Sequence, residues 1–146
     1  MSAVDDVFTY LGPSPGQGLA GGATGWALVR RRMGDPPTFA DQAVVVAEDG
    51  GPTPEIKAAS GIGAAAVQDP GVLVTVRAGA WDGDASKVKA AAILAALHGK
   101  LNIQLVSGGT TYYRVRAMTP EPIFAGFDET GRPRHTIAFR LLAAAA

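Results

Sequence analysis

The chain has 146 residues, with 13 basic and 13 acidic side chains, a formal net charge of zero and no cysteine. This balance argues against a dedicated nucleic-acid-binding protein, which normally carries a basic excess, and the lack of cysteine excludes disulfides and thiolate chemistry. The length suits one domain, residues 1–146, with its own core. We expect neither a signal peptide nor a membrane span, because the first turn is acidic and no apolar run approaches the roughly 20 residues that a span needs.

The first segment with helical periodicity is residues 3–11. Ser2 can cap this helix, and Gly12-Pro13 ends it. Its apolar side chains fall at the i, i+3, i+4 and i+7 positions of one helix face: Val4, Val7, Phe8 and Leu11. The glycine- and proline-rich residues 12–23 predict a loop.

Two strands are predicted next. Residues 24–33 alternate with the period of a strand, with Trp26 and Leu28 on one face. Residues 34–37 have the composition of a turn. The second strand, at 42–47, is an unbroken apolar run, which predicts that both of its faces are covered.

Residues 48–70 are predicted to form a long loop. Thr53-Pro54-Glu55 is typical of a helix start, since proline suits the first helical position, but Gly61 and Gly63 would end such a helix after about two turns. A loop of this length in a compact domain is usually functional or disordered. In the functional case, we expect an arm that becomes ordered on assembly.

A third strand at 71–78 precedes the main predicted helix, which runs from Ala85 to His98. Asp84 is predicted to cap this helix, and Gly99 to end it. One apolar stripe contains Val88, Ala91, Ala92 and Ala95, and a second contains Ala90, Ile93, Leu94 and Leu97. A helix that is apolar on two sides must be covered on both. The sheet covers one side, so either the N-terminal helix or a neighbouring subunit is expected to cover the other.

Two hairpins complete the predicted fold. Residues 102–106 and 110–118 pair around Ser107-Gly108-Gly109, and residues 122–127 pair with 134–142. On the first hairpin, Tyr113, Val115 and Ala117 alternate with Tyr112, Arg114 and Arg116; on the second, the inward residues are Ile137, Phe139 and Leu141. Ala143–Ala146 are expected to fray.

The predicted fold class is therefore α+β. A mainly antiparallel or mixed β-sheet carries one central helix, at about residues 84–98, on one face. A short N-terminal helix completes the domain.

Three patterns suggest chemistry but lack the context for it. Residues 16–21 spell G-x-G-x-x-G, with Asp41 20 residues further on, but no strand precedes this segment and no helix follows it, as a dinucleotide site requires. Asp82-Gly83-Asp84 is followed at once by a helix rather than by further calcium ligands. His98 and His135 lack the spacing of a metal pair or a catalytic triad. We therefore predict no catalytic, cofactor-binding or metal-binding residue, and a protein that is not an enzyme.

The arginines are candidates for a subunit interface instead. Arg30-Arg31-Arg32 is the densest basic run, but strand alternation would send Arg31 away from its neighbours, which argues against a DNA site. Outward positions of the last strands could place arginines in a row that pairs with the acids of another copy. The candidate interface residues are Arg31, Arg77, Tyr112, Arg114, Arg116 and Arg140.

The second half of the chain resembles a known family in the order and spacing of its segments. These segments are Pro70–Arg77, Leu97-His98-Gly99, Tyr112–Ala117, Glu121–Gly126, Asp128–Pro133 and Thr136–Arg140. Over about residues 70–142, the chain resembles the tail terminator proteins of long-tailed bacteriophages, also described as minor capsid or head–tail joining proteins, which occur in prophages and gene transfer agents too. Nothing in residues 48–69 aligns with that family.

This resemblance implies a structural virion protein at the head–tail junction, assembled in the cytoplasm of a host bacterium. Six copies would form a ring that caps the tail tube, terminates its polymerisation and joins the tail to the head connector. The implied partners are the tail-tube protein and a head-side connector or head-completion protein, and DNA would pass through the pore without sequence-specific contacts. The alternatives are another neck, tail-tube or head-completion component of the same particle and a small ligand-binding domain unrelated to phages.

Overall fold

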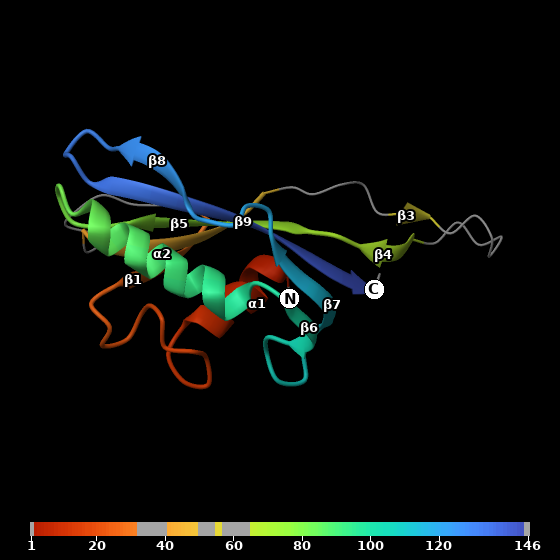
Figure 1. Cartoon of the computed structure of the whole chain (residues 1–146). Helices are drawn as coiled ribbons and strands as arrows, with labels where there is room; N and C mark the ends of the chain where they lie inside the picture. The colour runs from red at the N-terminus through yellow and green to blue at the C-terminus, as the bar shows by residue number, and fades with distance from the viewer. Residues whose placement is uncertain (1, 32–40, 50–54, 57–64, 145–146) are drawn as a thin grey trace.

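The computed structural model of the chain describes residues 2–31, 41–49, 55–56 and 65–144 (Figure 1). Two helices and nine strands follow one another along these residues. Their order is α1 (Ala3–Leu11), β1 (Ala27–Arg30), β2 (Ala43–Glu48), β3 (Glu55–Ile56), β4 (Ala65–Gln68), β5 (Gly71–Arg77), α2 (Gly83–Leu97), β6 (Lys100–Gln104), β7 (Thr111–Ala117), β8 (Ile123–Phe127) and β9 (Pro133–Ala144). The predicted α+β class is confirmed.

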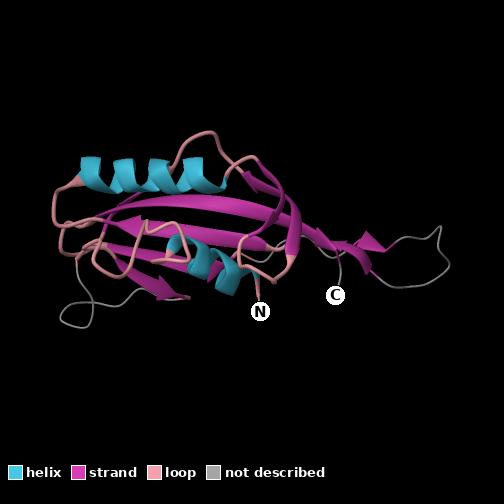
Figure 2. Cartoon of the chain, turned by 90° about the horizontal axis from the view of Figure 1, so that it is seen from below, coloured by secondary structure: helices cyan, strands magenta, loops and turns pink. Residues whose placement is uncertain are grey.

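All nine described strands belong to one mixed sheet. Strands β1 and β2 are parallel, and every other pair is antiparallel. The 12-residue strand β9 is the centre of the sheet, with β5 and β4 along one side and β8 and β7 along the other. Strands β3 and β4, with the end of β9, extend away from the rest of the sheet (Figures 1 and 2).

The core lies on one face of the sheet, because the strand register stacks apolar residues there. Val76 lies opposite Val44, and Val74 lies between Val46 on β2 and Ile137 on β9. All five side chains are fully buried. Both helices pack against this face, with α1 near β1 and β2 and α2 near β9 and β5 (Figure 2). The opposite face of the sheet carries no described helix, and we call it the open face.

The caps of the helices follow from short side chains beside their first turns. Ser2 and Asp5 form a reciprocal capping box on α1. The cap of α2 is Asp82, which accepts from the backbone N–H of Ala85, so the prediction that Asp84 is the cap is wrong. Asp84 lies in the first turn, where its charge favours the helix dipole. Gly99 follows the helix in a left-handed conformation (φ 80°), as predicted.

Only one of the two apolar stripes of α2 is covered within the described chain. The buried residues of this helix are Ser86, Ala90, Ile93 and Leu97. The other stripe is exposed, and Val88 keeps 69% of its surface accessible. Helix α1 contacts the edge of α2 instead, where Tyr10 donates to the carbonyl of Ala96 (3.3 Å). Of the two expected covers for the stripe of Val88, the N-terminal helix is therefore wrong, and a neighbouring subunit stays a prediction.

Several predicted boundaries also change. Strand β1 ends at Arg30 because Arg31 adopts a left-handed conformation (φ 68°) that leaves the extended region. Glu55 lies in β3, so it does not begin a helix; the rest of the predicted helix start and the turn at 34–37 lie outside the described residues. Ala143 and Ala144 pair with β7 and β4 rather than fray.

A bulge in β7 reverses the faces on which strict alternation places its two tyrosines. From Tyr112 to Arg114, β7 advances two residues while its partner β9 advances one, which marks a β-bulge. The extra residue reverses the alternation, so Tyr112, and not Tyr113, lies on the side of Val115. Tyr112 is 2% exposed and Tyr113 is 45% exposed.

The one-sided burial of α2 makes a measurable prediction. Ile93→Ala should lower the free energy of unfolding by about 2–5 kcal/mol, because it removes a fully buried side chain between the helix and the sheet. Val88→Ala, on the exposed stripe, should change it by less than about 0.5 kcal/mol. Urea unfolding of both variants measures this difference, and equal losses would contradict the described packing of α2.

Candidate interaction surface

Three of the predicted interface arginines share the open face of the sheet. Arg116 lies directly opposite Arg140, and Arg114 lies opposite Leu142. Directly opposite residues project to the same face, and so do residues two apart on one strand. Arg114, Arg116 and Arg140 therefore form a row on this face, which we call the arginine row. Arg116 is exposed, and the other two are partly buried.

No acidic side chain balances the row from the strands beside it. None of the described open-face positions on β5, β7 and β9 is an Asp or a Glu. Nη1 of Arg140 is buried and has no hydrogen-bond partner among the described residues. It lies 2.9 Å from the point that a Cβ on Gly71 would occupy, so glycine at this position makes room for the guanidinium. Since like charges on opposite residues repel, an acidic partner on this face would be stabilising.

The other two predicted interface arginines lie apart from the row. Arg31 is at the β1 edge, where its exposed guanidinium lies 3.6 Å from the carboxylate of Glu48. Arg77 is on the open face but is 2% exposed, and its Nε donates to the backbone carbonyl of Asp41 (3.0 Å). Arg77 therefore does not offer an accessible side chain.

Tyr112 is a core residue rather than an interface residue. Its hydroxyl donates to Oδ2 of Asp6, which is 1% exposed and lies on α1. Burial, together with the neighbouring Asp6 carboxylate, raises the pKa of Tyr112 far above its usual value. The contact links the N-terminal helix to β7. The interface prediction is wrong for Tyr112 because the bulge turns its side chain into the core.

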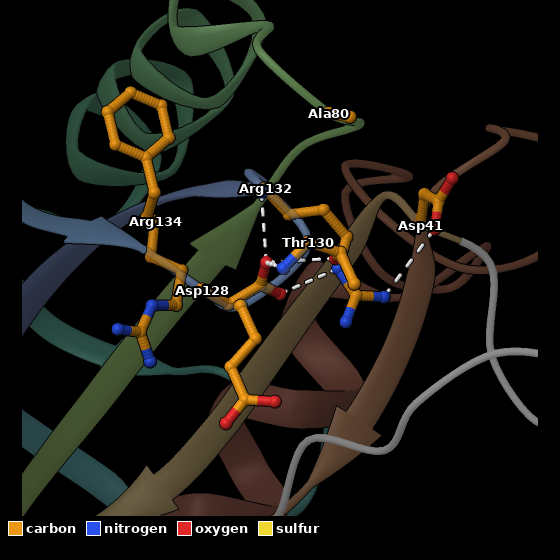
Figure 3. Close-up of a pocket in the computed structure, with 8 residues that line it drawn as sticks. Asp41, Ala80, Asp128, Thr130, Arg132 and Arg134 are labelled. Carbon is orange, nitrogen blue, oxygen red and sulfur yellow. Dashed lines mark hydrogen bonds and ion pairs between the residues drawn. The ribbon is translucent and has the colours of Figure 1, made fainter.

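A surface depression of about 770 Å³ lies beside the turn between β8 and β9 (Figure 3). Three of the five charged side chains that line it, Asp41, Asp128 and Arg132, bind one another. Arg132 Nε donates to Asp128 Oδ2 (2.6 Å), and Nη1 of the same arginine lies 3.5 Å from Asp41 Oδ1. Burial alone would raise the pKa of Asp128, but hydrogen bonds from Arg132 and Thr130 outweigh it and lower the pKa to about 2. These residues therefore fix the turn between β8 and β9, rather than presenting free groups to a ligand.

A buried serine–histidine pair joins α2 to β9. Ser86 Oγ and His135 Nδ1 are 2.7 Å apart, and the side chains are 0% and 7% exposed. A nucleophilic serine must reach its substrate, so this pair is structural. Its partners are 49 residues apart in sequence, and no spacing rule could have found it. His98 also has a structural contact, because its Nδ1 accepts from the backbone N–H of Ala117 (3.0 Å).

The remaining sequence patterns have structural roles as well. Residues 16–21 form a loop that follows α1, so the predicted loop is confirmed. Within the described part of the chain, no three His, Asp or Glu side chains cluster as a metal site. Neither described helix has the length and apolar character to cross a membrane.

An exposed cluster of aromatic side chains was missed by sequence reasoning. Trp81 lies before α2, whereas Phe124 and Phe127 are on β8; their exposed fractions are 76%, 50% and 48%. The ring centroids of Trp81 and Phe127, and of Phe124 and Phe127, are 5.3 Å apart. We call these three residues the aromatic patch. Only the fold brings the loop before α2 to β8.

Comparison with known proteins does not place the chain in a family. No family model matches its sequence, and no curated protein matches it either. The function must therefore be argued from the surfaces described above.

The Asp6–Tyr112 contact predicts a stability difference between the two adjacent tyrosines. Tyr112→Phe should lower the free energy of unfolding by about 1–3 kcal/mol, because it leaves a buried carboxylate without its donor. The matched change Tyr113→Phe, at an exposed position, should alter it by less than about 0.5 kcal/mol. Thermal and urea unfolding measure the two changes. Equal losses in the free energy of unfolding would contradict the burial of Tyr112 and the exposure of Tyr113.

The Ser86–His135 pair predicts a dependence of stability on pH. Burial, with a smaller effect of Lys87, lowers the pKa of His135 below its usual 6.5. The unfolded chain therefore binds a proton before the folded chain does, so stability should be full above about pH 6.5 and fall as the pH is lowered, by at most about 1.4 kcal/mol per pH unit.

Urea unfolding between pH 7.5 and 5 measures this slope. His135→Gln should reduce it, whereas Val88→Ala, at an exposed position without a titrating group, should keep it. Asp5 and Asp128, whose pKa values are lowered to about 2, lose their contributions only at more acidic pH. A slope that survives His135→Gln unchanged would rule out this residue as its source.

Proposed function

We propose that the chain is a structural virion protein that forms a ring at the head–tail junction of a long-tailed bacteriophage. In this proposal, the ring caps the tail tube, terminates its polymerisation and joins it to the head connector. The tail-tube protein and a head-side connector protein are its partners, and DNA passes through the pore. The protein acts by assembly and is not an enzyme.

The unbalanced arginine row is the observation that carries this proposal. Arg116 and Arg140 lie opposite each other with no acidic residue at the described open-face positions of their strands. Such a surface suits a partner that supplies carboxylates. The succession of β5, α2, β6, β7, β8 and β9 also keeps the order of segments on which the resemblance to tail terminators rests.

A tail-tube protein of the same kind of particle is the second candidate. The same row would serve contacts between its subunits, so the two proposals differ in the shape of the assembly. A terminator closes into rings, whereas a tube protein stacks into long cylinders. The depression beside Asp128 gives less support to a ligand-binding domain, because Asp41, Asp128 and Arg132 already pair with one another there.

Light scattering over a concentration series, with negative-stain imaging of the same fractions, tests the proposal. Closed rings of about six subunits are expected for a terminator. Open-ended cylinders would favour the tube protein. If the chain stays monomeric, mixing it with purified tail tubes should place it at one tube end, and its absence from the tubes would contradict the proposal.

Charge reversal tests the role of the row. Arg114→Glu combined with Arg116→Glu should raise the concentration needed for assembly at least tenfold, because it removes two cationic contacts. Arg31→Glu is the matched control, since Arg31 lies at the β1 edge beside Glu48. Sedimentation of the three proteins gives the comparison, and unchanged assembly of the double variant would exclude the row from the interface.

A further inference from the structure

The aromatic patch has the properties of a protein-binding surface. Trp81, Phe124 and Phe127 are 76%, 50% and 48% exposed. Soluble monomers rarely display large contiguous apolar surfaces unless these bind a partner. Strand β8 is also an edge strand, because β9 is its only partner in the described sheet.

The backbone holds Trp81 in an unfavourable conformation. Its φ of 62° lies in the left-handed region, which bulky side chains rarely adopt. Its N–H donates to the carbonyl of Gly131 (2.8 Å), and a Cβ at Gly131 would lie 2.8 Å from the indole ring. The loop therefore keeps a tryptophan strained and 76% exposed, which is typical of functional positions rather than of core residues.

Acidic residues adjoin the patch residues in sequence. Asp82 follows Trp81 directly, Asp84 lies two residues later, and Glu129 lies in the turn after Phe127; all three acids are exposed. Lys87, one turn into α2, is an exposed cation on the same helix. The depression beside Phe127 adds Asp41 and Asp128 to the acids and Arg132 and Arg134 to the cations. Acids still outnumber cations, so the patch is an apolar surface with a mainly acidic rim.

The patch and the arginine row are complementary in two respects. Guanidinium groups form bidentate contacts with carboxylates and stack on aromatic rings. The row offers three guanidinium groups, and the patch offers aromatic rings bordered by carboxylates. The two surfaces also lie on opposite faces of the sheet: Phe124 is opposite His135, on the helix side, whereas the row is on the open face. One molecule therefore cannot bring them together.

We propose that the aromatic patch of one copy binds the arginine row of the next copy. Because the two surfaces differ, the contact is head-to-tail, and it closes into a ring when the rotation between copies divides a full turn. This inference rests on the proposed ring and names the surfaces that form it. Trp81 inserts beside Arg116, and the acidic rim pairs with the rest of the row.

Two double variants each remove one of the two surfaces, and we call them the blocked variants. The row variant is Arg114→Glu with Arg116→Glu. The patch variant is Trp81→Gly with Phe124→Ser; glycine suits the left-handed backbone at position 81, so the monomer should remain folded. Each variant alone should be monomeric at concentrations where the wild-type chain assembles. Arg31→Glu, at the β1 edge beside Glu48, is the control for a surface change outside both surfaces and should assemble normally.

An equimolar mixture of the two variants gives the decisive result. Each retains one intact surface, so the mixture should form dimers that cannot grow, and sedimentation velocity or mass photometry would detect them. Circular dichroism and thermal unfolding of each variant confirm that both are folded. A folded pair that gives no dimer on mixing, or single variants that still form rings, would overturn the inference.

The outcomes also separate this contact from the proposed function. If the wild-type chain forms rings and the blocked variants do too, the ring stands and the contact is wrong. If the mixture gives dimers while the wild-type chain forms open cylinders, the contact is right and the terminator role is wrong. A wild-type chain that remains monomeric at every concentration overturns the contact.

Discussion

The pairing of β9 with strands on both sides is the constraint on which the rest of the structure depends. Pro133–Ala144 pairs with β5 and β4 along one side and with β8 and β7 along the other. Its alternation sends Ile137, Phe139 and Leu141 into the core. A one-residue slip would turn these side chains to the open face and bury Arg140 among the helices. The register of this strand therefore sets both the core and the arginine row.

Buried polar contacts fix the helices to this sheet. Asp6 on α1 binds Tyr112 on β7, and Ser86 on α2 binds His135 on β9. Unlike apolar contacts, a buried hydrogen bond requires one particular partner, because an unpaired polar group is costly in the interior. These pairs thus give specificity to helix positions that apolar packing alone would leave less defined. They explain why the buried polar groups near α2 serve the fold rather than catalysis.

Two unbalanced surfaces remain after the core is formed. The open face has arginines without acids at the described positions of the central strands, and the loop before α2 has a strained, exposed tryptophan. Each is unfavourable in an isolated monomer, through like-charge repulsion in one case and exposed apolar area in the other. Association between copies would relieve both.

The sequence by itself determined the elements whose signals are local. The periodicity of residues 3–11, the valines of β5 and the apolar run before Gly99 each predict an element that the structure contains. The alternation around Phe139 also placed its inward residues correctly. Two-residue periodicity further predicted that Arg114, Arg116 and Arg140 share a face, since side-chain direction in a strand follows from position alone.

Tertiary structure decided everything that depends on partners distant in sequence. The bulge in β7 that buries Tyr112 arises from its register with β9, and it has no signature within the strand. Strand β8 meets Trp81 only after the sheet has formed, so the aromatic patch had no local pattern. The sequence likewise did not decide which stripe of α2 faces the sheet, because both stripes are apolar. Local sequence sets periodicity, but contact energies between distant residues select the register, the face and the surface that stays exposed.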